Sequence, residues 1–106
     1  MKNYRVIWTP QAECDLREIK RYISRDAPST AKAFIRRIQE RVRKLGAMPT
    51  AASIVLEFER EDIREIYVGS YRIIFRIRES DVRILTVMHG AQLLRQSRIP
   101  GDENEE

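Results

Sequence analysis

Three apolar runs, separated only by short turn signals, constrain the fold of this chain more than any other feature. The runs cover residues 63–68, 71–78 and 82–89, and each is rich in β-branched and aromatic residues. Gly69-Ser70 and Ser80-Asp81 stand between them as candidate two-residue hairpin turns. Residues 54–58 form a further candidate strand. The spacing therefore predicts antiparallel strands in the second half of the chain.

The first half of the chain has the spacing of two amphipathic helices that follow a short strand at residues 4–8. Thr9 and Pro10 form a helix start, because a threonine side chain can cap the first turn. Proline is suited to the first helical position, where a backbone N–H would have no partner within the helix. Ser29 is a candidate cap for the second helix, and Gly46 is a natural end. The apolar faces consist of Ala12, Leu16, Ile19 and Ile23, and of Ala31, Phe34, Ile38, Val42 and Leu45.

The strand at residues 4–8, the two helices and the three apolar runs follow one another in the order β-α-α-β-β-β, which predicts an α+β fold. In this fold the N-terminal strand and the helical hairpin pack on one face of a mainly antiparallel four-stranded sheet. We expect a single domain at residues 1–99, since a chain of 106 residues has the usual size for one core. Residues 100–106 are expected to form an acidic, disordered tail.

Basic residues outnumber acidic ones by 20 to 16, and the tail holds four of the acids. This surplus favours a polyanionic or acidic partner, and a solvated basic surface is the simpler alternative.

The single cysteine, Cys14, excludes an internal disulfide and favours a reducing compartment. No apolar run is long enough for a signal peptide or a membrane span, so we expect a cytoplasmic protein.

The two turns also predict which side chains share a face of the sheet. If both are two-residue loops, Tyr67 faces Arg72 on the next strand, and Arg72 faces His89 on the strand after that. These three residues then form one row on a face exposed to solvent. That face would also carry Glu65, Arg76, Arg78 and Arg83, with the apolar residues Ile74, Leu85 and Val87 among them. The opposite, core face would carry Ile66, Val68, Tyr71, Ile73, Phe75, Ile77, Ile84 and Met88.

The row of Tyr67, Arg72 and His89 has the chemistry of phosphate recognition. Arginine offers a planar fork of donors to a phosphate and keeps its charge. Histidine titrates near neutral pH and serves as a general acid or base, and tyrosine can stack on a base. These residues suit RNA cleavage. The alternative interpretation is that the arginines only keep an exposed sheet face in solution.

A second candidate surface lies on the second predicted helix, which is densely basic. We expect a protein partner to bind a set of cations made up of Arg36, Arg37, Arg41, Arg43 and Lys44 from this helix, with Arg76 and Arg83 from the sheet. Arg36 and Glu40 have the spacing of a helical ion pair.

One histidine and one cysteine far apart in sequence predict no metal site, and the scattered glycines predict no phosphate loop, so no cofactor is expected.

Degenerate motifs in the helical hairpin and the strands resemble the RelE/ParE superfamily of toxins from bacterial toxin–antitoxin modules. They are A-x-x-D-L-x-x-I-x-x-Y-I, Y-R-I-I-F and V-x-I-L-T-V-x-H-G-A, and the resemblance covers roughly residues 4–95. It implies the same α+β fold as the periodicity. It also implies a growth-arresting toxin of a plasmid-stabilisation module, with a cognate antitoxin as its partner.

Members of this superfamily differ in their targets, and RelE-like members cut messenger RNA on the ribosome. Arg72 matches the arginine of their central strand, and His89 has a place resembling the histidine of YoeB-like members. Those members follow this histidine with a tyrosine, whereas this sequence has Gly90-Ala91. On this interpretation Arg72, His89 and Tyr67 are the catalytic residues.

ParE-like members lack that catalytic set and inhibit DNA gyrase by binding it. This chain has no lysine after Lys44, whereas RelE-like members use lysines on the sheet, and its general base would have to be Glu57 or Glu59. These departures favour a ParE-like gyrase inhibitor. Ribosome-dependent cleavage of messenger RNA is the alternative, and a non-toxic binding module is a further one.

Overall fold

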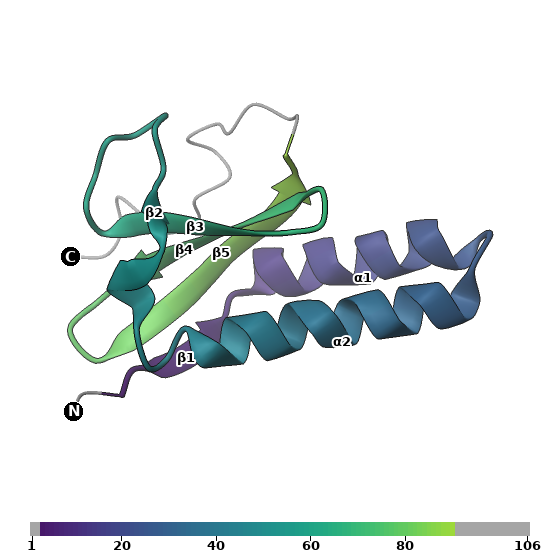
Figure 1. Cartoon of the computed structure of the whole chain (residues 1–106), viewed down its shortest axis with the longest axis horizontal. Helices are drawn as coiled ribbons and strands as arrows, with labels where there is room; N and C mark the ends of the chain where they lie inside the picture. The colour runs from purple at the N-terminus through teal and green to yellow at the C-terminus, as the bar shows by residue number, and fades with distance from the viewer. Residues whose placement is uncertain (1–2, 91–106) are drawn as a thin grey trace.

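The structure, a computed structural model, describes residues 3–90 and contains two layers (Figure 1). The helices lie side by side against one face of the sheet, and the turn between them extends past the strands. The elements are β1 (Arg5–Trp8), α1 (Pro10–Ser24), α2 (Pro28–Lys44), a 3-10 turn (Pro49–Ala51), β2 (Ser53–Ile54), β3 (Ile63–Val68), β4 (Tyr71–Ile77) and β5 (Asp81–His89).

The sheet confirms the predicted α+β fold but has five strands instead of four. Its order is β1-β5-β4-β3-β2, with β1 parallel to β5 and every other pair antiparallel. The additional strand is the edge strand β2, in which Ser53 pairs with Glu65 and Ile54 with Arg64. The candidate strand at residues 54–58 was wrong beyond Ile54, since residues 55–58 form no strand. The predicted acidic tail at residues 100–106 lies outside the described residues.

The two helices begin differently. Thr9 caps α1 as predicted, since its Oγ1 accepts from the Ala12 N–H at 3.3 Å. The same hydroxyl donates to the Ile84 carbonyl at 2.7 Å, which joins the helix start to β5. The predicted cap of α2 was wrong, because this helix begins at Pro28 and Ser29 lies within its first turn. Proline suits this first helical position, because a backbone N–H there would have no partner within the helix.

Gly46 follows the end of α2 and is required for close packing. A Cβ atom at this position would lie only 2.8 Å from the Tyr4 carbonyl oxygen. The Tyr4 N–H in turn donates to the Gly46 carbonyl at 2.7 Å. The glycine therefore lets the end of the helical hairpin contact the residue before β1.

Apolar side chains cover both faces of the sheet, whereas the sequence predicted a core on one face only. The larger cluster lies under the helices and includes Ala12, Ile19, Ile38, Val42, Leu45, Val68, Ile73, Phe75, Val82, Ile84 and Val87. A second cluster occupies the opposite face and consists of Val55, Ile63, Ile74, Leu85 and Met88, with Phe58 packed against it. Val55 and Phe58 come from the segment between β2 and β3. That segment therefore covers a face that was expected to be exposed.

The β3–β4 register is the predicted one, but the β4–β5 register is not. Tyr67 lies opposite Arg72 and Val68 opposite Tyr71, as expected for a loop of Gly69 and Ser70. At the other turn the Arg78 N–H donates to the Asp81 carbonyl at 2.8 Å. The chain therefore reverses over residues 79–80 instead of 80–81.

A β-bulge changes the β4–β5 register a second time. Phe75 lies opposite Ile84, but Ile74 lies opposite Thr86, so Leu85 is the additional residue. Asp15 of α1 stabilises this bulge, because its carboxylate accepts from the Val87 N–H at 3.0 Å and from the Thr86 hydroxyl. Asp15 is only 7% exposed. The bulge also reverses the predicted faces of residues 87 and 88: Val87 joins the cluster under the helices, and Met88 joins the opposite one.

Candidate functional site

The predicted row of Tyr67, Arg72 and His89 is only partly assembled. Tyr67 and Arg72 are cross-strand neighbours, and the Tyr67 side chain is 49% exposed. His89 lies opposite Tyr71, and the two rings make an edge contact with centroids 5.5 Å apart. Because Tyr71 packs against the cluster under the helices, His89 lies on the helix side of the sheet. The prediction that His89 shares a row with Arg72 was wrong, because the turn and the bulge both change the β4–β5 register, and the bulge at Leu85 moves His89 to the other face.

Arg72 is buried and bound by two carboxylates, instead of facing solvent. It is 4% exposed. Its Nη1 and Nη2 donate to the two carboxylate oxygens of Glu57, each at 3.0 Å, and its Nε donates to Glu65 at 2.7 Å. These hydrogen bonds, first the one with Glu57, raise the pKa of the guanidinium above its ordinary value. The fork that would hold a phosphate holds Glu57 instead.

Other arginines of the same face also have carboxylate partners. Arg76 Nε lies 3.3 Å from Asp62 Oδ2, and Arg60 lies 2.7 Å from the same oxygen. Burial alone would raise the pKa of the Asp62 carboxyl, but the hydrogen bond from Arg60 and the charges of Arg60 and Arg76 hold it below its ordinary value. Arg83 Nε lies 3.4 Å from Asp81. Local carboxylates therefore compensate much of the positive charge on this face.

The sequence interpretation missed the carboxylates that surround Arg72. Glu65 was placed on the same face as Arg72, which was a sufficient signal for an ion pair. Glu57 was considered only as a general base, and Glu59 likewise. In the structure Glu57 binds Arg72, and Glu59 follows in the left-handed backbone region with φ of 52°. Periodicity does not show where an irregular segment such as residues 55–62 will pack.

The predicted basic surface of α2 is present on the outside of the molecule. All five of its predicted cations are exposed: Arg36, Arg37, Arg41, Arg43 and Lys44. The expected Arg36–Glu40 ion pair was wrong, because Glu40 pairs with Arg43 at 3.1 Å. Both partners of that pair are mostly exposed, so the contact contributes little stability.

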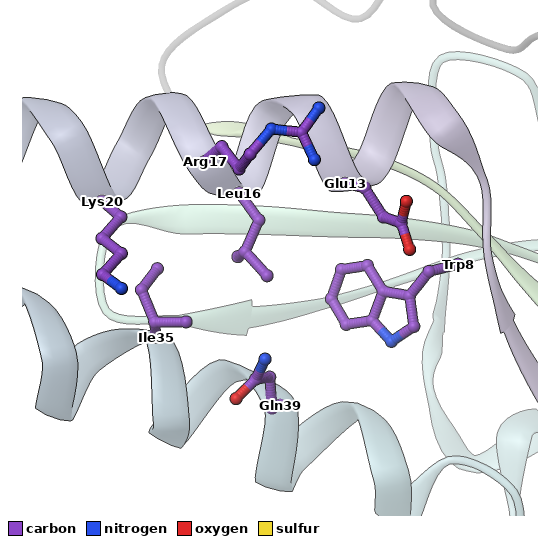
Figure 2. A pocket seen from close by; sticks show the side chains of 7 residues that line it. All are labelled: Trp8, Glu13, Leu16, Arg17, Lys20, Ile35 and Gln39. Carbon is purple, nitrogen blue, oxygen red and sulfur yellow. The ribbon is translucent and has the colours of Figure 1, made fainter.

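A groove lies between the helices on the side away from the sheet (Figure 2). It has a volume of about 400 Å³. Leu16 of α1 and Ile35 of α2 point toward each other across it, and the Trp8 ring lies at one end between the two helices. Polar and charged side chains border these apolar groups: Glu13, Arg17, Lys20 and Gln39.

A smaller hollow of about 250 Å³ lies beside His89, between α1 and the end of β5. Glu18, Tyr22 and Tyr71 line it together with His89.

Within residues 3–90 no group of three histidine, cysteine or acidic side chains is arranged to hold a metal ion. No helix in this part of the chain has the length and apolar character needed to cross a membrane.

Comparison with known proteins gives the family directly. The family model described as "ParE toxin of type II toxin-antitoxin system, parDE" matches residues 6–94. The chain belongs to the ParE toxin family. The superfamily resemblance predicted from the motifs is thereby confirmed. A comparison with curated protein sequences gave no match.

Solved structures support this ParE-family assignment at the level of the fold. A chain of the chromosomal ParDE toxin–antitoxin system from P. aeruginosa is 20% identical with a TM-score of 0.70, over 81% of this chain and 95% of that one. The toxin–antitoxin complex RelBE2 from Mycobacterium tuberculosis contains a chain that is 25% identical with a TM-score of 0.58, over 87% of this chain and 97% of that one.

A mutant of the E. coli toxin RelE in the free state shares the same fold. It is 13% identical with a TM-score of 0.62, over 84% of this chain and 85% of that one. ParE and RelE toxins therefore have one architecture, and the fold alone does not separate their targets. For this ParE-family chain, the choice between these targets depends on the contacts and charges of the side chains on the sheet and on α2.

Proposed function

We propose that this chain, the toxin component of a type II toxin–antitoxin module, arrests bacterial growth by inhibiting DNA gyrase. The observation that carries the proposal is the state of Arg72. Its guanidinium is held by Glu57 and Glu65, and His89 lies on the other face of the sheet. A cleavage site needs a cation that contacts the phosphate, and an acid or base within hydrogen-bond reach of the same reacting group. This arrangement supports a toxin that acts by binding.

Purified gyrase and ribosomes test the proposal side by side. The full chain is added to gyrase with relaxed plasmid, and supercoiled product is followed on agarose gels. In parallel the chain is added to translating ribosomes, and breaks in the message are mapped by primer extension. We expect loss of supercoiling and intact messages. Cleaved messages with normal supercoiling would instead make the chain a RelE-like endoribonuclease.

Growth arrest on induction provides the third measurement. A chain that arrests growth and inhibits gyrase agrees with the proposal. A chain that does neither, and also leaves messages intact, would be the non-toxic binding module. Location in the cytoplasm, a role in plasmid stabilisation, independence from cofactors and a single domain at residues 1–99 remain predictions from the sequence.

We also propose that a cognate antitoxin binds this toxin through an acidic segment. The support is electrostatic: without residues 101–106 the chain has 20 basic and 12 acidic residues. We expect nanomolar or tighter association that weakens between about 50 and 500 mM salt, because screening reduces attraction between opposite charges. Titration calorimetry across this range of salt concentration measures the affinity. An affinity that does not change with salt would mean that apolar contacts, such as those offered by the groove between α1 and α2, dominate the complex.

A further inference from the structure

The positive charge of this protein is concentrated on one of its two helices. α2 carries six cations and a single acid, Glu40, whereas α1 carries three cations and three acids. The two helices are adjacent, of similar length and both amphipathic, so their role in the core does not explain the difference. A need for solubility alone is met by mixed charges, as on α1.

The cations of α2 form two stripes on its exposed surface. Arg37, Arg41 and Lys44 follow one another at spacings of four and three, and are exposed along one flank. Lys32, Arg36 and Arg43 are exposed along the other flank. Glu40 lies between the stripes and pairs with Arg43. No acid within residues 3–90 makes a described ion pair with Arg37, Arg41 or Lys44.

Stabilisation of α2 itself accounts for only part of this pattern. Cations in the last turn complement the helix dipole, which favours Arg41, Arg43 and Lys44. Arg37 and Arg36 lie too far from the end for this effect. Arg37 and Arg41 are also like charges at i,i+4, which destabilise a helix. The helix dipole therefore accounts for Arg41 and Lys44 but not for Arg37, which completes the stripe and adds a like-charge repulsion that a partner of opposite charge would relieve.

We propose that α2 binds the phosphate backbone of duplex DNA through the stripe of Arg37, Arg41 and Lys44. From Arg37 to Lys44 the helix advances by seven residue steps, or about 10.5 Å along its axis. One DNA strand places a phosphate every ~3.4 Å along its axis, so the stripe matches about three phosphate intervals in length. The choice of DNA rests on the proposed function, since gyrase acts on duplex DNA. The toxin would then contact the DNA that gyrase holds, as well as the enzyme.

The test measures binding of the full chain to DNA alone, without gyrase. Fluorescence anisotropy with a labelled 20-base-pair duplex gives the affinity at several salt concentrations. Each neutralised phosphate contributes about −0.9 to the slope of log K against log salt. We therefore expect a slope of about −3 or steeper, and an R37Q/R41Q/K44Q variant in which the slope becomes shallower by about 2–3 units.

The matched control removes three cations from α1 and its C-terminal cap by R17Q/R21Q/R25Q. These residues are exposed, have nearly the same spacing, and change the net charge by the same amount. We expect their removal to change the slope by less than about 1 unit. Equal effects of the two triple variants would overturn the proposal, because the attraction would then be diffuse. A wild-type slope near zero would also overturn it.

Two competitors identify the partner class. Polyglutamate at equal charge concentration is expected to displace DNA poorly, and equal displacement would assign the stripe to an acidic protein instead. Binding to an RNA duplex as tight as to DNA would likewise overturn the assignment to DNA. DNA binding is measured without gyrase, so a toxin that inhibits supercoiling but ignores DNA would fail this proposal and keep the proposed function.

Discussion

Replacing Arg72 with alanine is expected to lower the free energy of unfolding by about 3–5 kcal/mol, the usual cost of breaking a buried ion pair. The side chain is 5% exposed, and its removal leaves the carboxylates of Glu57 and Glu65 close together without their cation. Glu65 is the more costly of the two, because its side chain is only 13% exposed. Urea denaturation followed by circular dichroism measures the change.

Two further variants show that the loss comes from the ion cluster. Arg83→Ala removes an arginine from the same face whose side chain is 40% exposed, and we expect a change within about ±0.5 kcal/mol. The triple variant E57Q/E65Q/R72M removes the buried charges together, and we expect it to recover at least half of the lost stability. A loss below about 1 kcal/mol for Arg72→Ala would contradict the structural role assigned to this residue.

The Arg72 result also changes how activity data must be interpreted. In a ribonuclease, removal of the catalytic arginine should abolish cleavage while the protein stays folded. Here Arg72→Ala is expected to reduce the folded population, since total stabilities of small domains are only about 5–15 kcal/mol. Loss of toxicity in this variant is therefore informative only beside a denaturation curve. His89→Ala is the cleaner variant, and we expect it to remain toxic.

Reversing Arg37 and Lys44 to glutamate is expected to abolish inhibition of gyrase, which is the largest functional effect that we predict. Both residues are exposed on α2, and the double change converts the stripe from strongly basic to acidic. The supercoiling assay measures it. The stability cost should stay near 1 kcal/mol or less, because two effects oppose each other: position 44 loses a cation that suits the last turn, and the new glutamate at position 37 gains a partner in Arg41.

A double reversal on α1 and its C-terminal cap, R21E/R25E, changes the net charge by the same amount and serves as the control. Both positions are exposed, and α1 as a whole is balanced in charge, so we expect inhibition to be largely kept. If the α2 variant inhibited gyrase as well as the unmodified chain does, α2 would not be the target-binding surface. If both double variants lost inhibition, net charge and not location would be responsible.

The sequence by itself determined the features that depend on neighbouring residues. Thr9 and Pro10 predicted the start of α1, the apolar spacing predicted both helices, and Gly69-Ser70 predicted the β3–β4 register. These are short-range effects of capping, periodicity and turn geometry. The exposed cations of α2 follow in the same way, because an amphipathic helix with a buried stripe must expose its remaining faces.

Only the tertiary structure decided the features that join distant segments. Asp15 accepts hydrogen bonds from Thr86 and Val87, stabilises the bulge at Leu85, and so places His89 away from Arg72. The irregular segment at residues 55–62 covers the second face of the sheet and brings Glu57 to Arg72. Neither contact has a periodic signal, because each depends on where a side chain from one element meets the backbone or charge of another. Burial then requires those polar groups to be paired, and the pairing determines which arginines remain available to a partner.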